Sequence, residues 1–261
     1  MTYERKIDFA LKLFRSIPQD GTIEVSYSGG KDSDVILELA KMSGIPFVGV
    51  YKQTSIDPPG TTAHAREMGV EVVPPVETFF HLVERKGQPS RFRRFCCSVL
   101  KEYKIPGHDR VVLGIRRSES TKRAVRYKEP EECRVYEKGG RVRQYYPILE
   151  WTDEDVERFI RERGIKCAPV YYDEDGRFHV ERRLGCIGCP LKSDNGLADF
   201  KKYPRFLRQY IRSYQKYLDS HKGTHFWNEI RGSAYNGLFY RLFCRTHEQY
   251  LSYIGGGYIW C

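Results

Sequence analysis

Residues 28–33 read Ser-Gly-Gly-Lys-Asp-Ser, between an apolar-alternating run at 23–27 and a helical pattern over 31–43. This order of strand, glycine-rich loop and helix suits a loop that cradles phosphate. The glycines let the backbone approach an anion, and the helix N-terminus offers unpaired N–H groups and a positive dipole end. Lys31 can pair with a phosphoanhydride oxygen. The loop is not a Walker motif, because no Gly stands five residues before a Gly-Lys-Ser/Thr. The alternative interpretation is a simple glycine turn.

The composition indicates a folded, basic protein. Of the 261 residues, 40% are hydrophobic, which is enough to build a core and argues against intrinsic disorder. The formal net charge of +10 predicts a surface that attracts phosphate, whether of a nucleotide or of a polynucleotide. Charge alone does not choose between these two ligands.

The sequence predicts a cytoplasmic protein without a spanning helix. No stretch approaches ~18 uninterrupted apolar residues. The first fourteen residues carry Asp8 and Lys12 within their apolar run, which is typical of an amphipathic surface helix and not of a secretory signal. Eight cysteines are too few for a disulfide scaffold in a chain of this length. Their clustering indicates thiolate ligation in a reducing compartment.

Strand and helix patterns alternate through the first half of the chain. We therefore expect an α/β fold, a doubly wound, mostly parallel sheet with helices on both faces. Gly44 and Gly69 each follow a helical pattern, where a left-handed C-cap is expected. In such sheets ligands bind at the carboxyl ends of the strands, which places 28–33, 54–61 and 114–120 around one crevice. The strand and helix pairs are 23–27 with 31–43, 47–53 with 61–68, 70–73 with 77–86, and a strand at 110–113.

The second half is expected to begin with a flexible excursion at 116–146 that contains a Gly139-Gly140 hairpin. Thr152 then caps a helix with Asp155 at the capping-box position. Residues 200–245 are rich in Tyr, Phe, Arg and Lys at helical spacing, and their aromatic side chains could form a core or a binding surface. We expect a nucleotide-binding domain with a metal site at 1–195 and a helical, basic and aromatic extension at 196–261.

Two cysteine pairs point to a metal centre. Cys186 and Cys189 flank Ile-Gly, a spacing that lets two thiolates converge. Cys96 and Cys97 are adjacent in a helical pattern over 92–103, so their side chains point about 100° apart and converge poorly on one zinc ion. A [4Fe-4S] cluster can accept one thiolate at each of two corners and is therefore favoured. A structural zinc site and unligated buried cysteines are the alternatives.

Taken together, these motifs resemble the phosphoadenosine phosphosulfate reductase family of PP-loop proteins, whose fold is adenine nucleotide alpha-hydrolase-like. The resemblance covers roughly residues 20–192. The motifs that carry it are 28–33, 54–61, 93–101, 114–120, 147–151 and the Cys186/Cys189 pair.

This resemblance implies roles for individual residues. The four cysteines are similar to the ligands of a [4Fe-4S] cluster in iron–sulfur adenylylsulfate reductases, with Lys101 beside cluster and substrate. Arg116 and Arg117 are expected to bind the anionic end of the nucleotide. The implied catalytic residues are Lys31, Asp32, Lys101, Arg116 and Arg117. The implied nucleotide-binding residues are Ser28, Gly29, Gly30, Lys31, Asp32, Ser33, Thr54, Gly114, Arg116 and Arg117.

The chain also departs from the sulfonucleotide reductases. It has no Glu-Cys-Gly segment, which in those enzymes carries the cysteine that attacks sulfur. Lys31 and Ser33 keep the loop form of family members that bind intact ATP and cleave it between the α and β phosphates. Residues 57–61 match the family only loosely, so the resemblance gives the location of this segment and not its contacts.

Three functions are compatible with the sequence. The first, which the motifs favour, is sulfur insertion into nucleic acid: ATP with Mg²⁺ adenylates an oxygen, a donor such as a cysteine desulfurase supplies sulfur, and AMP leaves. Under this hypothesis a basic helix face would bind the polynucleotide through Arg205, Arg208, Arg212 and Lys216. The second is a sulfonucleotide reductase that releases sulfite, with Cys244 or Cys261 as nucleophile and thioredoxin as reductant. The third is a nucleotide-binding, redox-sensing module.

Overall fold

The computed structural model describes residues 1–136, 140–244, 248–249 and 252. The chain divides into two compact units, each built from segments that are not contiguous in sequence. The first unit comprises Met1–Gln53, Asp57–Pro75 and Ser98–Gly185, and the second comprises Thr54–Ile56, Val76–Cys97 and Cys186–Cys261. The predicted domain boundary after residue 195 stays a prediction.

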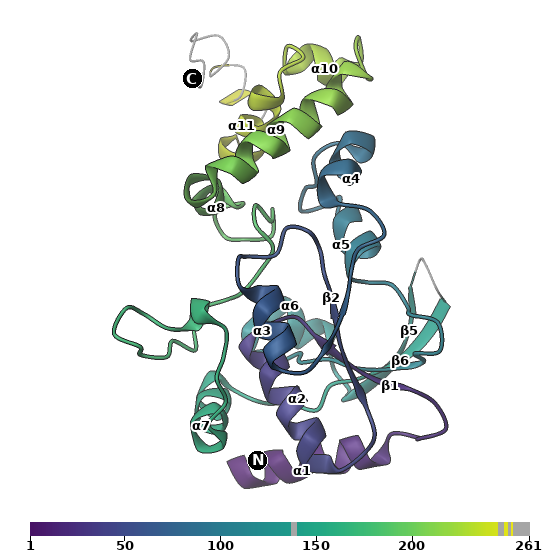
Figure 1. Cartoon of the computed structure of the whole chain (residues 1–261). Helices are drawn as coiled ribbons and strands as arrows, with labels where there is room; N and C mark the ends of the chain where they lie inside the picture. The colour runs from purple at the N-terminus through teal and green to yellow at the C-terminus, as the bar shows by residue number, and fades with distance from the viewer. Residues whose placement is uncertain (137–139, 245–247, 250–251, 253–261) are drawn as a thin grey trace. The chain divides into compact units, whose positions relative to one another are not determined.

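The first unit is an α/β fold around a six-stranded sheet in the order β3-β2-β1-β4-β6-β5 (Figure 1). Its parallel part joins β3 to β2, β2 to β1, β1 to β4 and β4 to β6, and β5 pairs antiparallel with β6. The predicted doubly wound, mostly parallel sheet is therefore confirmed. The strands are β1 (Ile23–Tyr27), β2 (Val48–Lys52), β3 (Glu71–Val73), β4 (Arg110–Val112), β5 (Glu131–Tyr136) and β6 (Gly140–Tyr145).

Helices cover this sheet, and their apolar faces supply the core. Helix α2 packs against α1, α7 and strand β1. The core includes Val35, Ile36 and Leu39 of α2, all of which are buried. The helices of this unit are α1 (Tyr3–Ser16), α2 (Lys31–Ser43), α3 (Thr61–Glu67), α6 (Thr121–Arg126) and α7 (Asp153–Arg163), with short 3₁₀ turns η1 (Arg117–Glu119) and η2 (Pro169–Tyr171).

The helix-capping predictions are confirmed. Gly44 and Gly69 have φ values of 76° and 74°, the left-handed region that glycine enters without the penalty of a Cβ. Thr152 and Asp155 form the reciprocal capping box at the start of α7.

The expectation of a flexible excursion at 116–146 is wrong. This segment contains η1, α6 and the β5–β6 pair, and β6 extends the parallel sheet beside β4. Val142 and Tyr145 of β6 are buried, so apolar burial stabilises a segment whose charged composition suggested a loop. Gly140 begins β6, whereas Gly139 lies outside the described residues.

The second unit is helical and has an aromatic core. Helix α9 packs against α4, α8 and α11. Phe79, Phe200, Phe206 and Tyr210 form mutual ring contacts with centroids 5.7–6.3 Å apart, so these aromatic side chains form a core. The helices are α4 (Phe79–Lys86), α8 (Leu197–Lys202), α9 (Pro204–Asp219), α10 (His225–Glu229) and α11 (Ala234–Phe243); α5 (Phe95–Leu100) runs from this unit into the first.

Helix α5 is shorter than the pattern over 92–103 predicted. Phe92 is 101% exposed, so its side chain contributes no burial that would favour a helical turn there. Within the part of the chain that the structure describes, none of the helices is both long and apolar enough to cross a membrane.

Candidate functional site

The 28–33 loop connects β1 to α2 with the geometry that its glycines require. Gly29 has a φ of 75°, and a Cβ added there would lie 2.7 Å from Thr61 Cγ2 and 3.1 Å from Leu184 Cδ2. Gly30 is the N-cap of α2, and its carbonyl accepts hydrogen bonds from the Ser33 and Asp34 amides at 2.8 and 3.0 Å. The loop is therefore closely packed and leads directly into a helix N-terminus.

Side chains of the loop hold it further. The Ser33 hydroxyl donates to the Gly30 carbonyl at 2.6 Å, and the Ser28 hydroxyl donates to Ser33 Oγ at 3.3 Å. Lys31 Nζ lies 3.2 Å from Asp32 Oδ2 and 5.6 Å from the centroid of the Tyr171 ring. Burial raises the pKa of the Tyr171 hydroxyl to about 12, so this group stays a neutral phenol beside the loop.

The loop lies where the strand order reverses. Strand β1 has β2 on one side and β4 on the other, which is the point at which ligands bind in open α/β sheets. The segment after β4 approaches the loop so closely that a Cβ on Gly114 would lie 2.8 Å from the Asp32 carbonyl oxygen. A pocket of about 300 Å³ opens here. Six of the predicted nucleotide-binding residues line it: Ser28, Gly30, Lys31, Asp32, Ser33 and Gly114.

Two arginines outside the predicted set of nucleotide-binding residues also line this pocket. Arg123 belongs to α6, and Arg183 donates from Nη2 to the Glu119 carbonyl oxygen at 2.8 Å. Burial lowers the pKa of the Arg123 guanidinium, and the nearby positive charge of Arg183 lowers it further. An anion in the pocket would relieve this repulsion between like charges. The pocket therefore suits a phosphorylated ligand.

Arg116 and Arg117, which were expected to bind an anion, have protein partners. Arg116 is 1% exposed; its Nε donates to Asp32 Oδ1 and its Nη2 to Asp153 Oδ1, both at 2.7 Å. Arg117 donates to the Tyr127 carbonyl oxygen at 2.7 Å and pairs with Glu150. Arg116 thus fixes the carboxylate of Asp32 in the loop, and its anion-binding role stays a prediction.

A buried polar cluster that sequence reasoning missed lies at the start of α2. Asp34 is 0% exposed; it accepts a hydrogen bond from the Tyr27 hydroxyl, and its Oδ1 lies 3.1 Å from His64 Nε2. Burial raises the pKa of the Asp34 carboxyl, and the hydrogen bonds from His64 and Tyr27 oppose that rise. Burial likewise raises the pKa of the Cys167 thiol, and the Asp34 charge adds to the effect. Tyr27, Asp34 and His64 tie the end of β1, the first turn of α2 and α3 together.

The four paired cysteines all belong to the second unit. A hydrogen bond with Cys97 raises the pKa of the Cys96 thiol most, followed by burial and by the charges of Cys97, Cys186 and Cys189. All four thiols are therefore near enough to interact electrostatically. Among the residues with described positions, however, no group of three or more His, Cys, Asp or Glu side chains is placed to hold a metal ion.

Thr54 was expected in the nucleotide site, but it lies in the second unit beside a cysteine. Its side chain is buried, and its Oγ1 is 3.7 Å from Cys186 Sγ. Lys101 is half-buried and lies in the first unit. Cys244 is half-buried on the second unit, and Cys261 is outside the described residues.

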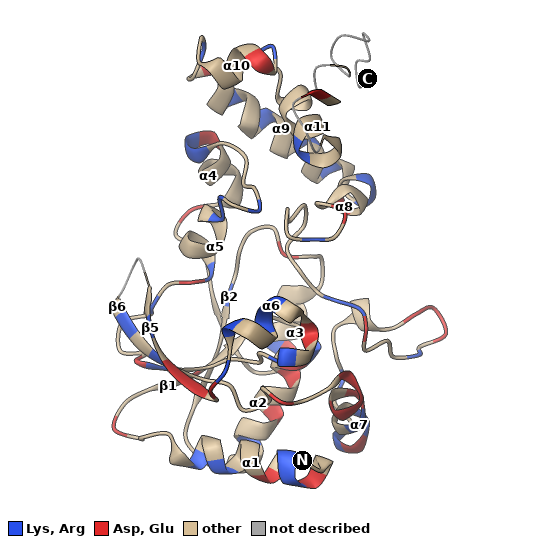
Figure 2. Ribbon diagram, turned by 180° about the vertical axis from the view of Figure 1, so that it is seen from behind, with Lys and Arg blue, Asp and Glu red and all other residues tan. Residues whose placement is uncertain are grey.

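The four basic residues predicted to bind nucleic acid lie on α9, and all are exposed. Figure 2 shows basic residues spaced along this helix. Lys216 Nζ lies 2.9 Å from Glu84 Oε1 of α4, so part of its charge is compensated within the unit.

The fold and the pocket define an α/β protein with a glycine-rich loop and a pocket at the reversal of its strand order. The chain belongs to the family of the phosphoadenosine phosphosulfate reductase domain, whose sequence model matches residues 22–192.

Among known proteins, the chain is similar to an uncharacterized 37.8 kDa protein from the gpa 5′ region of Escherichia phage 186, with 30% identity over 149 residues. The matched region covers 52% of this chain and 42% of the phage protein, so the chain matches less than half of that protein's length.

Two solved structures are similar at low identity. Candida glabrata FMN adenylyltransferase is 17% identical, with a TM-score of 0.49, and the match covers 71% of this chain and 62% of that one. The phosphate complex of phosphoadenylyl-sulfate reductase from Candida auris is 16% identical, with a TM-score of 0.49 and coverage of 70% and 93%.

Proposed function

We propose that this protein is an ATP-cleaving enzyme that activates an oxygen of a nucleic acid for sulfur insertion. The observation that carries the proposal is the pocket at the strand-order reversal, where the loop, Lys31, Arg123 and Arg183 surround a space for an anion. Membership of the phosphoadenosine phosphosulfate reductase domain family supports an adenine nucleotide as the ligand.

In this mechanism the acceptor oxygen attacks the α-phosphorus of ATP, and pyrophosphate leaves. Lys31 and the N-terminus of α2 bind phosphate oxygens, and Arg123 and Arg183 offset the negative charge that develops on the leaving group. Arg116 holds Asp32 in place. A sulfur nucleophile then displaces AMP from the adenylated position.

The residues of the pocket fit a magnesium ion. Mg²⁺ binds through one or two carboxylates together with substrate phosphates and keeps several waters. Asp32 and Glu119 supply carboxylates in the pocket lining, where Asp32 pairs with Arg116 and Glu119 with Arg123. Mg²⁺ bound there would neutralise the pyrophosphate.

The four cysteines are proposed to hold a [4Fe-4S] cluster. Their charges interact within one unit, and a cluster is larger than a single ion, so its ligands need not converge on one point. Such a cluster would supply the sulfur-transfer chemistry of the second step. We propose a cysteine desulfurase as the sulfur donor and a cytoplasmic location, in which thiolates stay reduced.

The nucleotide chemistry is tested with anaerobically purified full-length protein given ATP and pools of RNA or DNA. The expected result is release of pyrophosphate. Lys31→Ala should reduce its rate about 100-fold, the effect of removing one charge-stabilising donor. Lys41→Ala is the matched control, because Lys41 is exposed near the C-terminal end of the same helix. Equal rates for the two variants would contradict the loop assignment.

The alternative functions give different products in the same assay. Sulfite released from adenylylsulfate or 3′-phosphoadenylylsulfate, without pyrophosphate from ATP, would establish the reductase, for which the partner is thioredoxin. Nucleotide binding without either product would favour the redox-sensing module.

The cluster is tested by metal analysis. Anaerobically purified protein should be brown and contain about four irons per chain, and Cys97→Ala or Cys186→Ala should remove them. Cys133→Ala should retain the iron, because Cys133 is an exposed residue of β5 in the first unit. Stoichiometric zinc without iron would contradict the cluster.

A further inference from the structure

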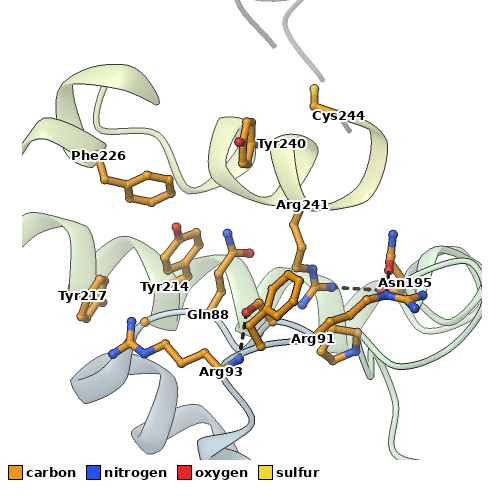
Figure 3. Close-up of a pocket in the computed structure, with 14 residues that line it drawn as sticks. Gln88, Arg91, Arg93, Asn195, Tyr214, Tyr217, Phe226, Tyr240, Arg241 and Cys244 are labelled. Atoms are coloured by element: carbon orange, nitrogen blue, oxygen red, sulfur yellow. Dashed lines mark hydrogen bonds between the residues drawn. The ribbon is translucent and has the colours of Figure 1, made fainter. Parts of the chain in front are cut away.

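The second unit contains its own cavity of about 560 Å³, distinct in its residues from the nucleotide pocket. Its walls come from α9, α10, α11 and the segment before α5 (Figure 3). Five aromatic side chains line it: Phe92, Tyr214, Tyr217, Phe226 and Tyr240. The volume lies within the range of small-molecule sites, and the rings offer flat faces for stacking.

Arginines supply positive charge at the same cavity. Arg91 and Arg93 line it and are exposed, and Arg241 lines it from α11. The Arg91 guanidinium is oriented by Asn195 Oδ1 at 3.0 Å and by the Lys192 carbonyl oxygen at 2.8 Å. Phe92, which also lines the cavity, is 101% exposed. Arginine beside aromatic faces is the combination that binds the phosphate and the base of a nucleotide.

Polar side chains also meet at this cavity: the Tyr214 hydroxyl interacts with the side chain of Gln88, and the buried Arg241 Nε has no hydrogen-bond partner within the described residues. The Gln88 amide is oriented, because its Nε2 donates to the Gly237 carbonyl oxygen at 2.9 Å. An amide oxygen accepts, an arginine Nε–H donates and a phenol does both. A ligand with donors and acceptors along one edge would therefore find matching polar groups on these side chains. A nucleobase has such an edge.

The cavity is also close to both cysteine pairs along the chain. Pro190 lines it and directly follows Cys189, and Arg93 lines it three residues before Cys96. Three residues span at most about 11 Å. A group bound in the cavity therefore lies near the side chains proposed to carry the sulfur chemistry.

We infer that this cavity receives one nucleotide of a single-stranded polynucleotide, with its base against the aromatic rings and its phosphate at Arg91 and Arg93. This inference rests on the proposed function for the role of that polynucleotide as substrate. Helix α9 supports a polymer over a free mononucleotide. The helix contributes Tyr214 and Tyr217 to the cavity and carries exposed Arg205, Arg208 and Arg212 along its length of about 24 Å.

The test measures binding of fluorescent single-stranded RNA and DNA of about 16 nucleotides to the full-length protein without ATP. Tyr240→Ala should weaken binding about 5- to 150-fold, the effect of removing one stacking ring. Tyr235→Ala is the matched control, since Tyr235 is an exposed tyrosine of the same helix that does not line this cavity. The polymer whose affinity falls, RNA or DNA, identifies the substrate class.

A second variant separates binding from structure. Tyr214→Phe keeps the buried ring and removes only the hydroxyl at the cavity, so the fold should be retained while affinity falls several-fold. Wild-type affinity for both polymers in Tyr240→Ala and Tyr214→Phe would overturn the inference. The inference would also be overturned if AMP displaced the fluorescent oligonucleotide at the same concentration as the unlabelled oligonucleotide does, because a free mononucleotide would then bind as well as the polymer.

The outcomes for this cavity and for the proposed function are independent. Oligonucleotide binding that depends on Tyr240, without pyrophosphate release from ATP, would support the cavity and contradict the proposed function. Pyrophosphate release together with oligonucleotide binding that does not depend on Tyr240 would support the proposed function and contradict the role of the cavity.

Discussion

Gly29→Ala tests whether the loop is closely packed as well as left-handed. Alanine at a φ of 75° costs about 1–2 kcal/mol. Its Cβ would also lie 2.7 Å from Thr61 Cγ2, and overpacking of this kind adds about 1–3 kcal/mol. We therefore expect the free energy of unfolding of the first unit to fall by about 2–5 kcal/mol, measured by urea denaturation.

Gly107→Ala is the matched control for this variant. Gly107 belongs to the same unit and has a φ of 83°, but a Cβ there would meet nothing within 4 Å. It should lose only the backbone part, about 1–2 kcal/mol.

A double variant identifies the contact. Thr61→Ser removes Cγ2 and keeps the hydroxyl that donates to the Pro58 carbonyl oxygen at 2.8 Å. Combined with Gly29→Ala, it should recover most of the overpacking, a coupling energy of about 1–3 kcal/mol. Simple additivity, or equal losses for Gly29→Ala and Gly107→Ala, would refute the argument.

Three further predictions follow from the described contacts. Arg116→Ala should lower the free energy of unfolding by about 3 kcal/mol in a urea titration, because it leaves the Asp32 carboxylate without its buried partner. The Arg117 side chain is 31% exposed, so Arg117→Ala should lower the same free energy by only about 1 kcal/mol. Equal losses would contradict the assignment. Burial raises the folded-state pKa of Asp34, so the carboxyl's contribution to stability is fully present below its ordinary pKa of 3.8 and is lost as pH rises through the folded-state pKa. Asp34→Asn should remove this pH dependence of stability. Parallel stability–pH profiles of the wild type and the variant would contradict the argument. Replacing the four basic residues of α9 with Ser should flatten the log–log salt dependence of RNA or DNA binding by up to about three units, and an unchanged slope would place the phosphate contacts elsewhere.

The parts of the molecule that could be predicted from sequence are those set by local interactions. The bounds of β1 and α2 coincide with their predicted ranges, because a period-2 run, two glycines and a period-3.6 run follow one another within 21 residues. The capping box at Thr152 was readable for the same reason. Six of the residues expected around the nucleotide line one pocket, because strand ends in a parallel sheet meet at one edge.

What could not be predicted depends on partners distant in sequence. Asp34 meets His64 thirty residues away, and no periodicity records that contact. Arginine is a residue type that binds anions, but the Arg116 guanidinium donates hydrogen bonds to the carboxylates of Asp32 and Asp153. Neither contact could be predicted from the sequence. Strand β5 was not predicted because its sequence is rich in charged residues. An edge strand with one solvated face needs few apolar residues.

The second unit is built from three separate segments of the chain, and this determines when it can fold during synthesis. Its segments begin at Thr54, Val76 and Cys186, so translation must reach the last third of the chain before the unit can assemble. The first unit ends at Gly185 and is complete in sequence by then. Domains generally fold as units during synthesis, so the sheet can fold on the ribosome before the segment from Cys186 onward, with which residues 76–97 share a unit, has been made. During this interval Cys96 and Cys97 are separated from Cys186 and Cys189, so the two cysteine pairs can come together only after the last segment has been made.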